Sequence, residues 1–275
     1  MLSAMIGCYP VPAFALETIA AGASTVAIPV SKADRLQIQL DNAQFSDWTA
    51  KRLELDLKTI DLQAGTLKGV NLRYSDGVIE RLPIEHFSLS SRPLQAGVSA
   101  VSFDAFELVN FQRLVLRQPI SADVRIVLSE VGLNQFLSHP ETIQKLESQL
   151  AKQTGIALAT FDDLSIRLSR GNIMSIAMTV TIAQALKTNI VLTGKLVAKN
   201  GGVEVTRLKM ESNGNPFPFD VSALLTDQIN KTIDVKRFTK KSGITLSINH
   251  IHLTGSTLTL DGVGQVNRLS FGSGR

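Results

Sequence analysis

Alternation of apolar and polar residues with a period of two constrains this chain most strongly. Residues 53–58 read LELDLK, and residues 121–128 read SADVRIVL, so every second residue is apolar. Successive side chains of a β-strand point to opposite faces, and such segments therefore give a sheet one apolar and one polar face. This alternation predicts antiparallel strands that are buried on one face only.

The pattern returns after residue 160 in longer segments. Residues 163–169, 173–182, 189–198, 203–211, 243–253 and 257–266 are all predicted strands. Asn200-Gly201-Gly202 and Thr254-Gly255-Ser256 join two pairs of these strands as hairpin turns. Ser75-Asp76-Gly77 is also predicted to be a turn. Residues 98–111 fit either a helix or irregular structure, and Leu114 and Leu116 indicate a short strand beyond them.

Two segments follow the helical period instead. The first begins after Ser129, a plausible N-cap residue, is interrupted at Ser138-His139-Pro140 and continues over residues 141–154. The second follows Asp220 and ends near Lys231. Both carry an apolar stripe, which indicates two amphipathic helical units lying against the sheet. The stripes contain Leu133, Phe136, Leu137, Ile143, Leu146, Leu150, Leu224, Leu225 and Ile229.

These elements predict an α+β fold in which a long, curved antiparallel β-sheet is covered by amphipathic helices. We expect a single domain over residues 31–268 and a flexible tail over 269–275. Residues 1–30 are predicted to be an N-terminal arm or an atypical export signal, since Ala13-Phe14-Ala15 resembles a cleavage site but no basic segment precedes it.

Composition limits the classes of function. The 44% apolar content supports a large core, and the 5% aromatic content argues against a large aromatic cofactor pocket. Cys8 is the only cysteine, so no disulfide can form within the chain.

The C-terminal part of the chain is basic. From Val235 onward the chain has six basic residues and one acidic residue. This bias lacks the density and the interleaved aromatic residues of a nucleic-acid groove, so we expect no nucleic-acid partner.

A basic cluster lies just beyond the second predicted helix. It contains Lys236, Arg237, Lys240 and Lys241, with Phe238 among them. One interpretation is that the cations bind phosphate headgroups or an anionic membrane surface while Phe238 enters the interface. The alternative is an ordinary solvated loop.

The candidate catalytic and metal-binding motifs are incomplete. His250-x-His252 places two imidazoles on one strand face, but no further metal ligand is evident nearby. Adjacent Asp162 and Asp163 would point to opposite faces of a strand, and Gly262-x-Gly264 lacks the remaining residues of a nucleotide loop. No G-x-S-x-G motif is present. We therefore expect no catalytic residue, metal or cofactor.

Three segments resemble the LmeA-like phospholipid-binding family, most closely its cyanobacterial members. They are residues 119–150, Gly202–Asp220 and Ile244–Val266, and the resemblance extends over about Lys32–Val266. Its signature is a strand that enters a helix through Leu128-Ser129-Glu130, followed by Leu133-Asn134 and Leu137. The family is similar to tubular lipid-binding proteins, in which a curved sheet wraps helices around an apolar cavity for acyl chains. The resemblance implies phospholipid binding at the cell envelope without catalysis.

The resulting hypothesis is a non-enzymatic phospholipid-binding or lipid-carrier protein, peripheral to a membrane in the cell envelope or periplasm. The incomplete export signal leaves the cytoplasmic face as an alternative compartment. Candidate cavity residues are the helical stripe residues together with Val124, Ile126 and Leu128 of the preceding strand. Phospholipid and an anionic membrane surface are the expected partners. The alternatives are a structural envelope protein that pairs through a sheet edge and, with less support, a lipid hydrolase.

Overall fold

The computed structural model divides the chain into two compact units. Unit 1 contains residues 1–126, 235–247 and 261–275, and unit 2 contains residues 127–234 and 248–260. The structure describes residues 3–8, 19–20, 32–44, 48–79, 81–104, 113–144, 147–148, 159–182, 186–213, 215–216, 230 and 243–270. The predicted single domain over 31–268 stays a prediction.

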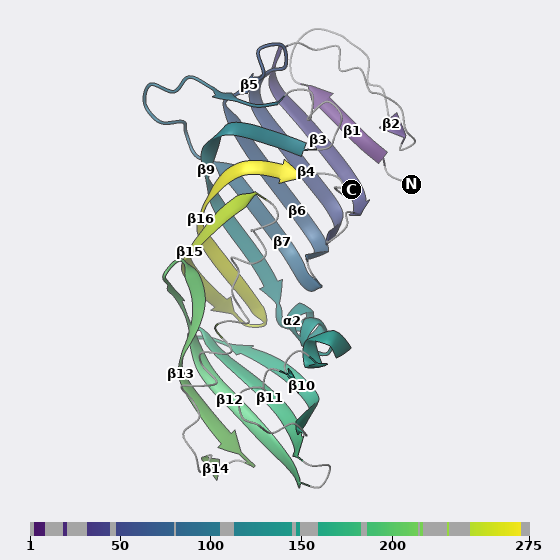
Figure 1. The fold of residues 1–275 in the computed structure, drawn as a ribbon, viewed down its shortest axis with the longest axis vertical. Coiled ribbons are helices and arrows are strands. Elements are labelled where there is room, and N and C mark those ends of the chain that lie inside the picture. The colour runs from purple at the N-terminus through teal and green to yellow at the C-terminus, as the bar shows by residue number, and fades with distance from the viewer. Residues whose placement is uncertain are drawn as a thin grey trace. The chain divides into compact units, whose positions relative to one another are not determined.

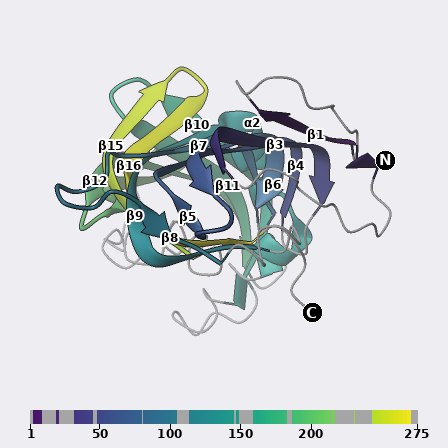
Figure 2. The ribbon, with the colours of Figure 1, turned by 90° about the horizontal axis from the view of Figure 1, so that it is seen from above.

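Unit 1 is built on a curled antiparallel sheet (Figures 1 and 2). Its strands are β1 Ser3–Cys8, β2 Ile19–Ala20, β3 Lys32–Gln44, β4 Trp48–Asp61, β5 Thr66–Leu67, β6 Gly69–Ile79, β7 Leu82–Ser91 and β8 Val101–Ser102. β9 Arg113–Ser129, β15 Ile244–Thr254 and β16 Thr257–Ser270 each contribute residues to both units. The strand order is β15-β16-β9-β7-β6-β4-β3-β1-β2, and β5 pairs with both β4 and β8.

The register of unit 1 brings the alternating apolar residues together. Ile38, Leu55, Leu72 and Leu89 form one row across β3, β4, β6 and β7. Each of these side chains is at most 9% exposed, and the residues between them on each strand face away from this row. The period-two pattern therefore predicts this core correctly.

The predicted turn at Ser75-Asp76-Gly77 is wrong. β6 continues through it to Ile79, and Ser75 and Gly77 pair with strands on both sides. Asp76 adopts a positive φ of 48° within the strand, and β6 ends only at Ile79, with β7 beginning at Leu82. Local turn residues are overridden here because β4 and β7 both supply pairing partners.

The predicted strands around Leu114–Leu116 and over 121–128 are one continuous strand, β9, which runs directly into α2. The ambiguous stretch over 98–111 contains the short strand β8 and a bridge between Phe103 and Leu116. Its residues 105–111 lie outside the described part of the chain.

Unit 2 contains a second antiparallel sheet in the order β10-β11-β12-β13-β14 (green in Figure 1). These strands are β10 Ala159–Ser169, β11 Ile173–Ile182, β12 Leu186–Lys199, β13 Gly202–Ser212 and β14 Asn215–Pro216. The two hairpin predictions are confirmed. Asn200 and Gly201 have φ values of 53° and 70°, as a two-residue hairpin turn requires, and Gly255 between β15 and β16 has a φ of 61°.

Helix is much less abundant than the α+β prediction implies, because the described residues are mostly antiparallel strand. Helix α2 spans only Glu130–Leu137, and a further helical stretch covers residues 140–144 and 147–148. The Ser138-His139-Pro140 break is confirmed. The second predicted helix lies outside the described residues except for Asn230, so the amphipathic helical units are not established as predicted. No helix within the described ranges is long and apolar enough to cross a membrane.

Candidate lipid-binding site

The entry into α2 is fixed by its first residues. The Ser129 backbone is extended, with φ −97° and ψ 156°, and its side chain accepts a hydrogen bond from the Gly132 N–H. The Oγ–N distance is 3.1 Å. This is the geometry of an N-cap, so the predicted start of the helix is confirmed.

Asn134 attaches α2 to the neighbouring strand β10. Its Nδ2 donates to the Ile166 carbonyl at 3.0 Å, and its Oδ1 accepts from the Ile166 N–H at 2.6 Å. Glu130 adds a second contact, because its carboxylate accepts from the Leu168 N–H at 2.7 Å. The side chains of the helix therefore satisfy backbone groups on the edge of β10, as another strand would.

Asn230 forms the same pair of bonds at β13. Its Oδ1 accepts from the Val205 N–H at 2.6 Å, and its Nδ2 lies 3.4 Å from the Val205 carbonyl oxygen. The sequence indicated Asn134 only as part of the family signature, without a structural role, and did not single out Asn230. The available signal was an asparagine inside each predicted helix, where its helix propensity is poor.

A third asparagine bonds to the backbone of β15. Asn172, in the β10–β11 turn, donates to the Ile251 carbonyl at 2.9 Å and accepts from the Leu253 N–H at 3.1 Å. The Gly201 carbonyl in the β12–β13 turn also accepts from the Ile248 N–H at 3.0 Å. Backbone groups on three strands of unit 2 are thus bonded by turns or asparagine side chains.

One face of the five-stranded sheet carries rows of apolar side chains. The register aligns Ile166, Ile176, Leu192 and Met210 in one row across β10 to β13. Ile166 and Leu192 are buried, whereas Ile176 and Met210 are half-buried. The next cross-strand pair, Met178 and Ile190, is half-buried as well. This apolar face therefore combines a packed part with a partly accessible part.

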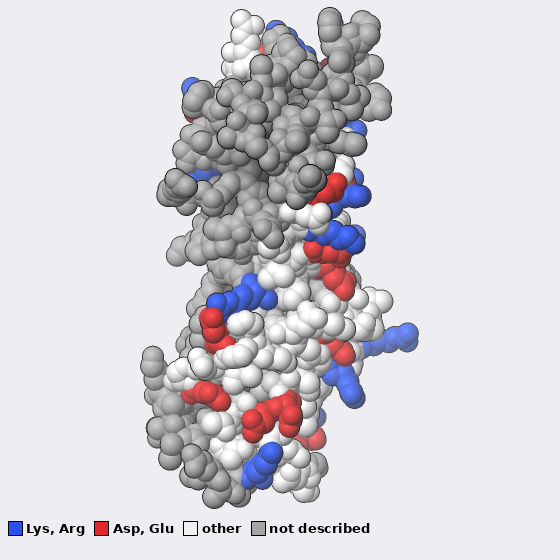
Figure 3. All heavy atoms as spheres, turned by 90° about the vertical axis from the view of Figure 1, so that its right-hand side faces the viewer, with Lys and Arg blue, Asp and Glu red and all other residues white. Residues whose placement is uncertain are grey.

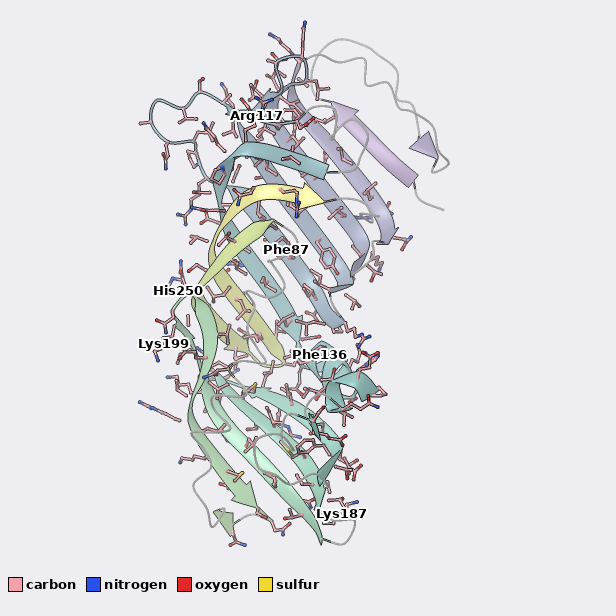
Figure 4. All side chains as sticks on the ribbon, in the orientation of Figure 1. Phe87, Arg117, Phe136, Lys187, Lys199 and His250 are labelled. Atoms are coloured by element: carbon pink, nitrogen blue, oxygen red, sulfur yellow. The ribbon has the colours of Figure 1, made fainter. Side chains whose placement is uncertain are left out.

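The predicted cavity residues occupy different environments. Val124 and Ile126 are buried in unit 1, and Leu128 and Leu137 are buried in unit 2. Leu133, Phe136 and Ile143 are half-buried on or just after α2, and Figure 4 labels Phe136 on this helix and Phe87 on β7. The remaining predicted cavity residues lie outside the described residues: Leu146, Leu150, Leu224, Leu225 and Ile229. The same holds for the predicted docking residues Lys236, Arg237, Phe238, Lys240 and Lys241.

The other candidate motifs have ordinary surroundings. His250 and His252 are both exposed on β15, and the described residues contain no group of three potential metal ligands. Asp162 and Asp163 lie 3.5 Å from the hydroxyls of Thr181 and Thr179, respectively. Gly262 and Gly264 lie within β16 and so do not form a loop.

The polar face of unit 1 carries paired charges. Arg35 forms two hydrogen bonds to Asp56, at 2.7 and 2.8 Å, and this contact raises the pKa of Arg35. Arg125 lies 2.6 Å from Asp261, which raises the pKa of Arg125 in the same way. Further ion pairs join Lys32 to Asp61, Arg52 to Asp41, Arg73 to Glu54 and Arg92 to Asp123. Figure 3 shows Lys and Arg beside Asp and Glu on the described surface.

Comparison with known families supplies the identification. A model of the LmeA-like phospholipid-binding family matches residues 33–263, most of the chain. The chain belongs to this family. The match confirms the resemblance inferred from the β9–α2 signature. The description of the family names phospholipid binding. No curated protein and no solved structure matches the chain.

Proposed function

We propose that this LmeA-like chain is a non-enzymatic phospholipid carrier of the cell envelope. Phospholipid is the ligand that the family description names. The acyl chains lie against the apolar face of the five-stranded sheet, and the helical units cover them. The observation that carries this assignment is the partly accessible row on that face, which includes Ile176, Met178, Ile190 and Met210.

The energetics of such a site are favourable without any headgroup chemistry. Burial of one methylene contributes about 0.8 kcal/mol, so one acyl chain contributes about 10 kcal/mol before the cost of association. The unbranched thioether side chains of Met178 and Met210 adapt to acyl chains of different length. The proposed carrier therefore selects phospholipids broadly.

The alternative of a structural protein that pairs through a sheet edge has less support. Asn134 bonds both backbone groups of Ile166 on β10, and Asn230 bonds both backbone groups of Val205 on β13. An incoming strand would have to displace these side chains to pair there.

Lipid uptake tests the proposal directly. Protein purified under gentle conditions is expected to carry phospholipid in native mass spectrometry and to take up a fluorescent phospholipid. Ile190→Glu places a charge on the apolar face, and we expect it to reduce uptake at least about tenfold, because desolvating an unpaired carboxylate is costly. Ser165→Glu is the matched control, since Ser165 is exposed on the opposite face of the same sheet.

Circular dichroism and urea unfolding should show that both variants are folded. If repeated preparations contain no lipid and take up none, the carrier function is excluded. Equal uptake by the two variants would show that the lipid lies elsewhere.

A further inference from the structure

The polar face of the five-stranded sheet has a composition that the lipid-carrier proposal does not use. Arg167, Ser175, Thr193 and Lys209 form one row across β10 to β13. The hydroxyls of Ser175 and Thr193 lie 3.2 Å apart, which shows that they share a face. A basic residue thus lies at each end of a four-residue row about 14 Å long, the width of three strand spacings, with the two hydroxyl residues between them.

Lys195 extends this row toward the β12–β13 turn. It lies two residues from Thr193 on β12, and it pairs with Ile173 on β11 and Thr206 on β13. Arg167, Lys195 and Lys209 are all exposed, and none has an ion pair within the described part of the chain. These three residues are named the basic triad.

The acidic residues of this face leave the triad unneutralised. Glu204 is bonded to Lys199 at 3.1 Å. Asp162 and Asp163 lie at the bulge of β10, 3.5 Å from the hydroxyls of Thr181 and Thr179, and at least four residues along the strand from Arg167. Glu211 lies two residues from Lys209 and opposite Val191 in the register, and it has no ion pair among the residues that the structure describes.

Exposed aliphatic side chains lie beside the triad. Ile173 is 39% exposed and Val191 is 36% exposed, and they are two of the four large hydrophobic residues that the described chain exposes. Val191 lies two residues from Thr193 on β12, and Ile173 lies two residues from Ser175 on β11, so both share the polar face with the triad. Cations, hydroxyls and short aliphatic groups together suit the headgroup region of a lipid bilayer.

We propose that this face of the five-stranded sheet docks on an anionic phospholipid membrane. The triad contacts lipid phosphates, the Ser175 and Thr193 hydroxyls donate to phosphate oxygens, and Ile173 and Val191 contact the interface. The inference goes beyond lipid uptake, because it assigns membrane attachment to the face opposite the proposed acyl-chain site.

Vesicle binding by the full chain tests the assignment. The triple variant Arg167→Gln, Lys195→Gln and Lys209→Gln is compared with a control in which Lys51, Lys58 and Lys68 become Gln. These control lysines are exposed in unit 1 and have no ion pair among the described residues, so the loss of charge is matched. Sedimentation uses vesicles of phosphatidylglycerol and phosphatidylcholine, with pure phosphatidylcholine as the neutral reference.

We expect the triad variant to bind the anionic vesicles about a hundredfold more weakly at low salt, since each basic residue near an anionic membrane contributes about fivefold. The control variant should keep most of the wild-type affinity. Raising the salt concentration should narrow the difference between wild type and triad variant, because exposed charges are screened. Equal losses in the two variants, or no loss in the triad variant, would overturn the assignment.

A second variant tests the aliphatic contact. Ile173→Ser with Val191→Ser should weaken vesicle binding severalfold at high salt, where the electrostatic part is screened. Unchanged vesicle binding at high salt would exclude this part of the assignment. If wild type binds soluble heparin but not anionic vesicles, the face binds a polyanion and the membrane assignment fails.

Uptake of a soluble short-chain phospholipid separates this inference from the carrier function. The triad variant should keep wild-type uptake, because its substitutions lie on the opposite face from Ile190. Vesicle binding without uptake would refute the carrier function alone, and uptake without vesicle binding would refute the docking face alone.

Discussion

Gly77 shows how one residue permits a strand to continue through a predicted turn. A Cβ atom at this position would lie 2.0 Å from the Thr49 carbonyl oxygen and 2.1 Å from the Tyr74 hydroxyl. That hydroxyl is itself held, since it donates to the Thr49 carbonyl at 2.5 Å, and burial raises the pKa of Tyr74 so that it remains a donor. Only glycine leaves room for this contact.

Gly77→Ala is therefore expected to lower the free energy of unfolding by about 1–3 kcal/mol, the typical cost of overpacking. Gly202→Ala is the control, because its added Cβ would lie 3.7 Å from the Lys199 carbonyl oxygen. Urea unfolding measures both. If the two variants have the same free energy of unfolding, the backbone around Tyr74 can shift to accommodate the added Cβ at little cost.

At the scale of elements, α2 acts as a cover for the edge of β10. The helix is only eight residues long, and isolated helices of this length are unstable in water. Its N-cap and its bonds to Ile166 and Leu168 hold it in place. The edge and the helix therefore stabilise each other.

Asn134→Ala removes both bonds to Ile166, and we expect a loss of about 2 kcal/mol because each hydrogen bond contributes about 1 kcal/mol. Hydrogen exchange should accelerate at the Ile166 amide. Gln135→Ala, on the exposed side of the same helix, should change neither quantity appreciably. Unchanged exchange at Ile166 in the Asn134 variant would mean that the edge does not depend on this side chain.

At the scale of the whole molecule, each unit is assembled from separated parts of the chain. Unit 1 takes residues 235–247 and 261–275 in addition to residues 1–126, and β16 pairs with β9. β9, β15 and β16 each continue from one unit into the other. Neither unit is a continuous segment that can be cut out with all its strands.

A fragment of residues 1–126 should consequently lack a cooperative thermal transition, because it has no β16 to pair with β9. The full chain is expected to unfold cooperatively, and circular dichroism during heating compares the two. Cooperative unfolding of the fragment would show that the first eight strands and the part of β9 in it suffice for folding.

The sequence by itself determined the features that depend on interactions between near neighbours in the chain. Period-two alternation located β4, β9, β15, β16 and the long strands β10 to β13. Ser129 marked the start of α2, and Asn200-Gly201 marked a hairpin, because each signal acts within a few residues. The β9–α2 signature also indicated the family, and the family match confirms it.

Tertiary structure decided the features that depend on distant partners. β6 passes through Ser75-Asp76-Gly77 because β4 and β7 pair with it on both sides, and the two predicted strands before α2 merge into β9. Asn134 and Asn230 gained roles only when β10 and β13 came within hydrogen-bond distance. Strand order and edge contacts join residues that are far apart in sequence. A local sequence pattern does not specify which distant strand will pair with a segment or bond to its side chains.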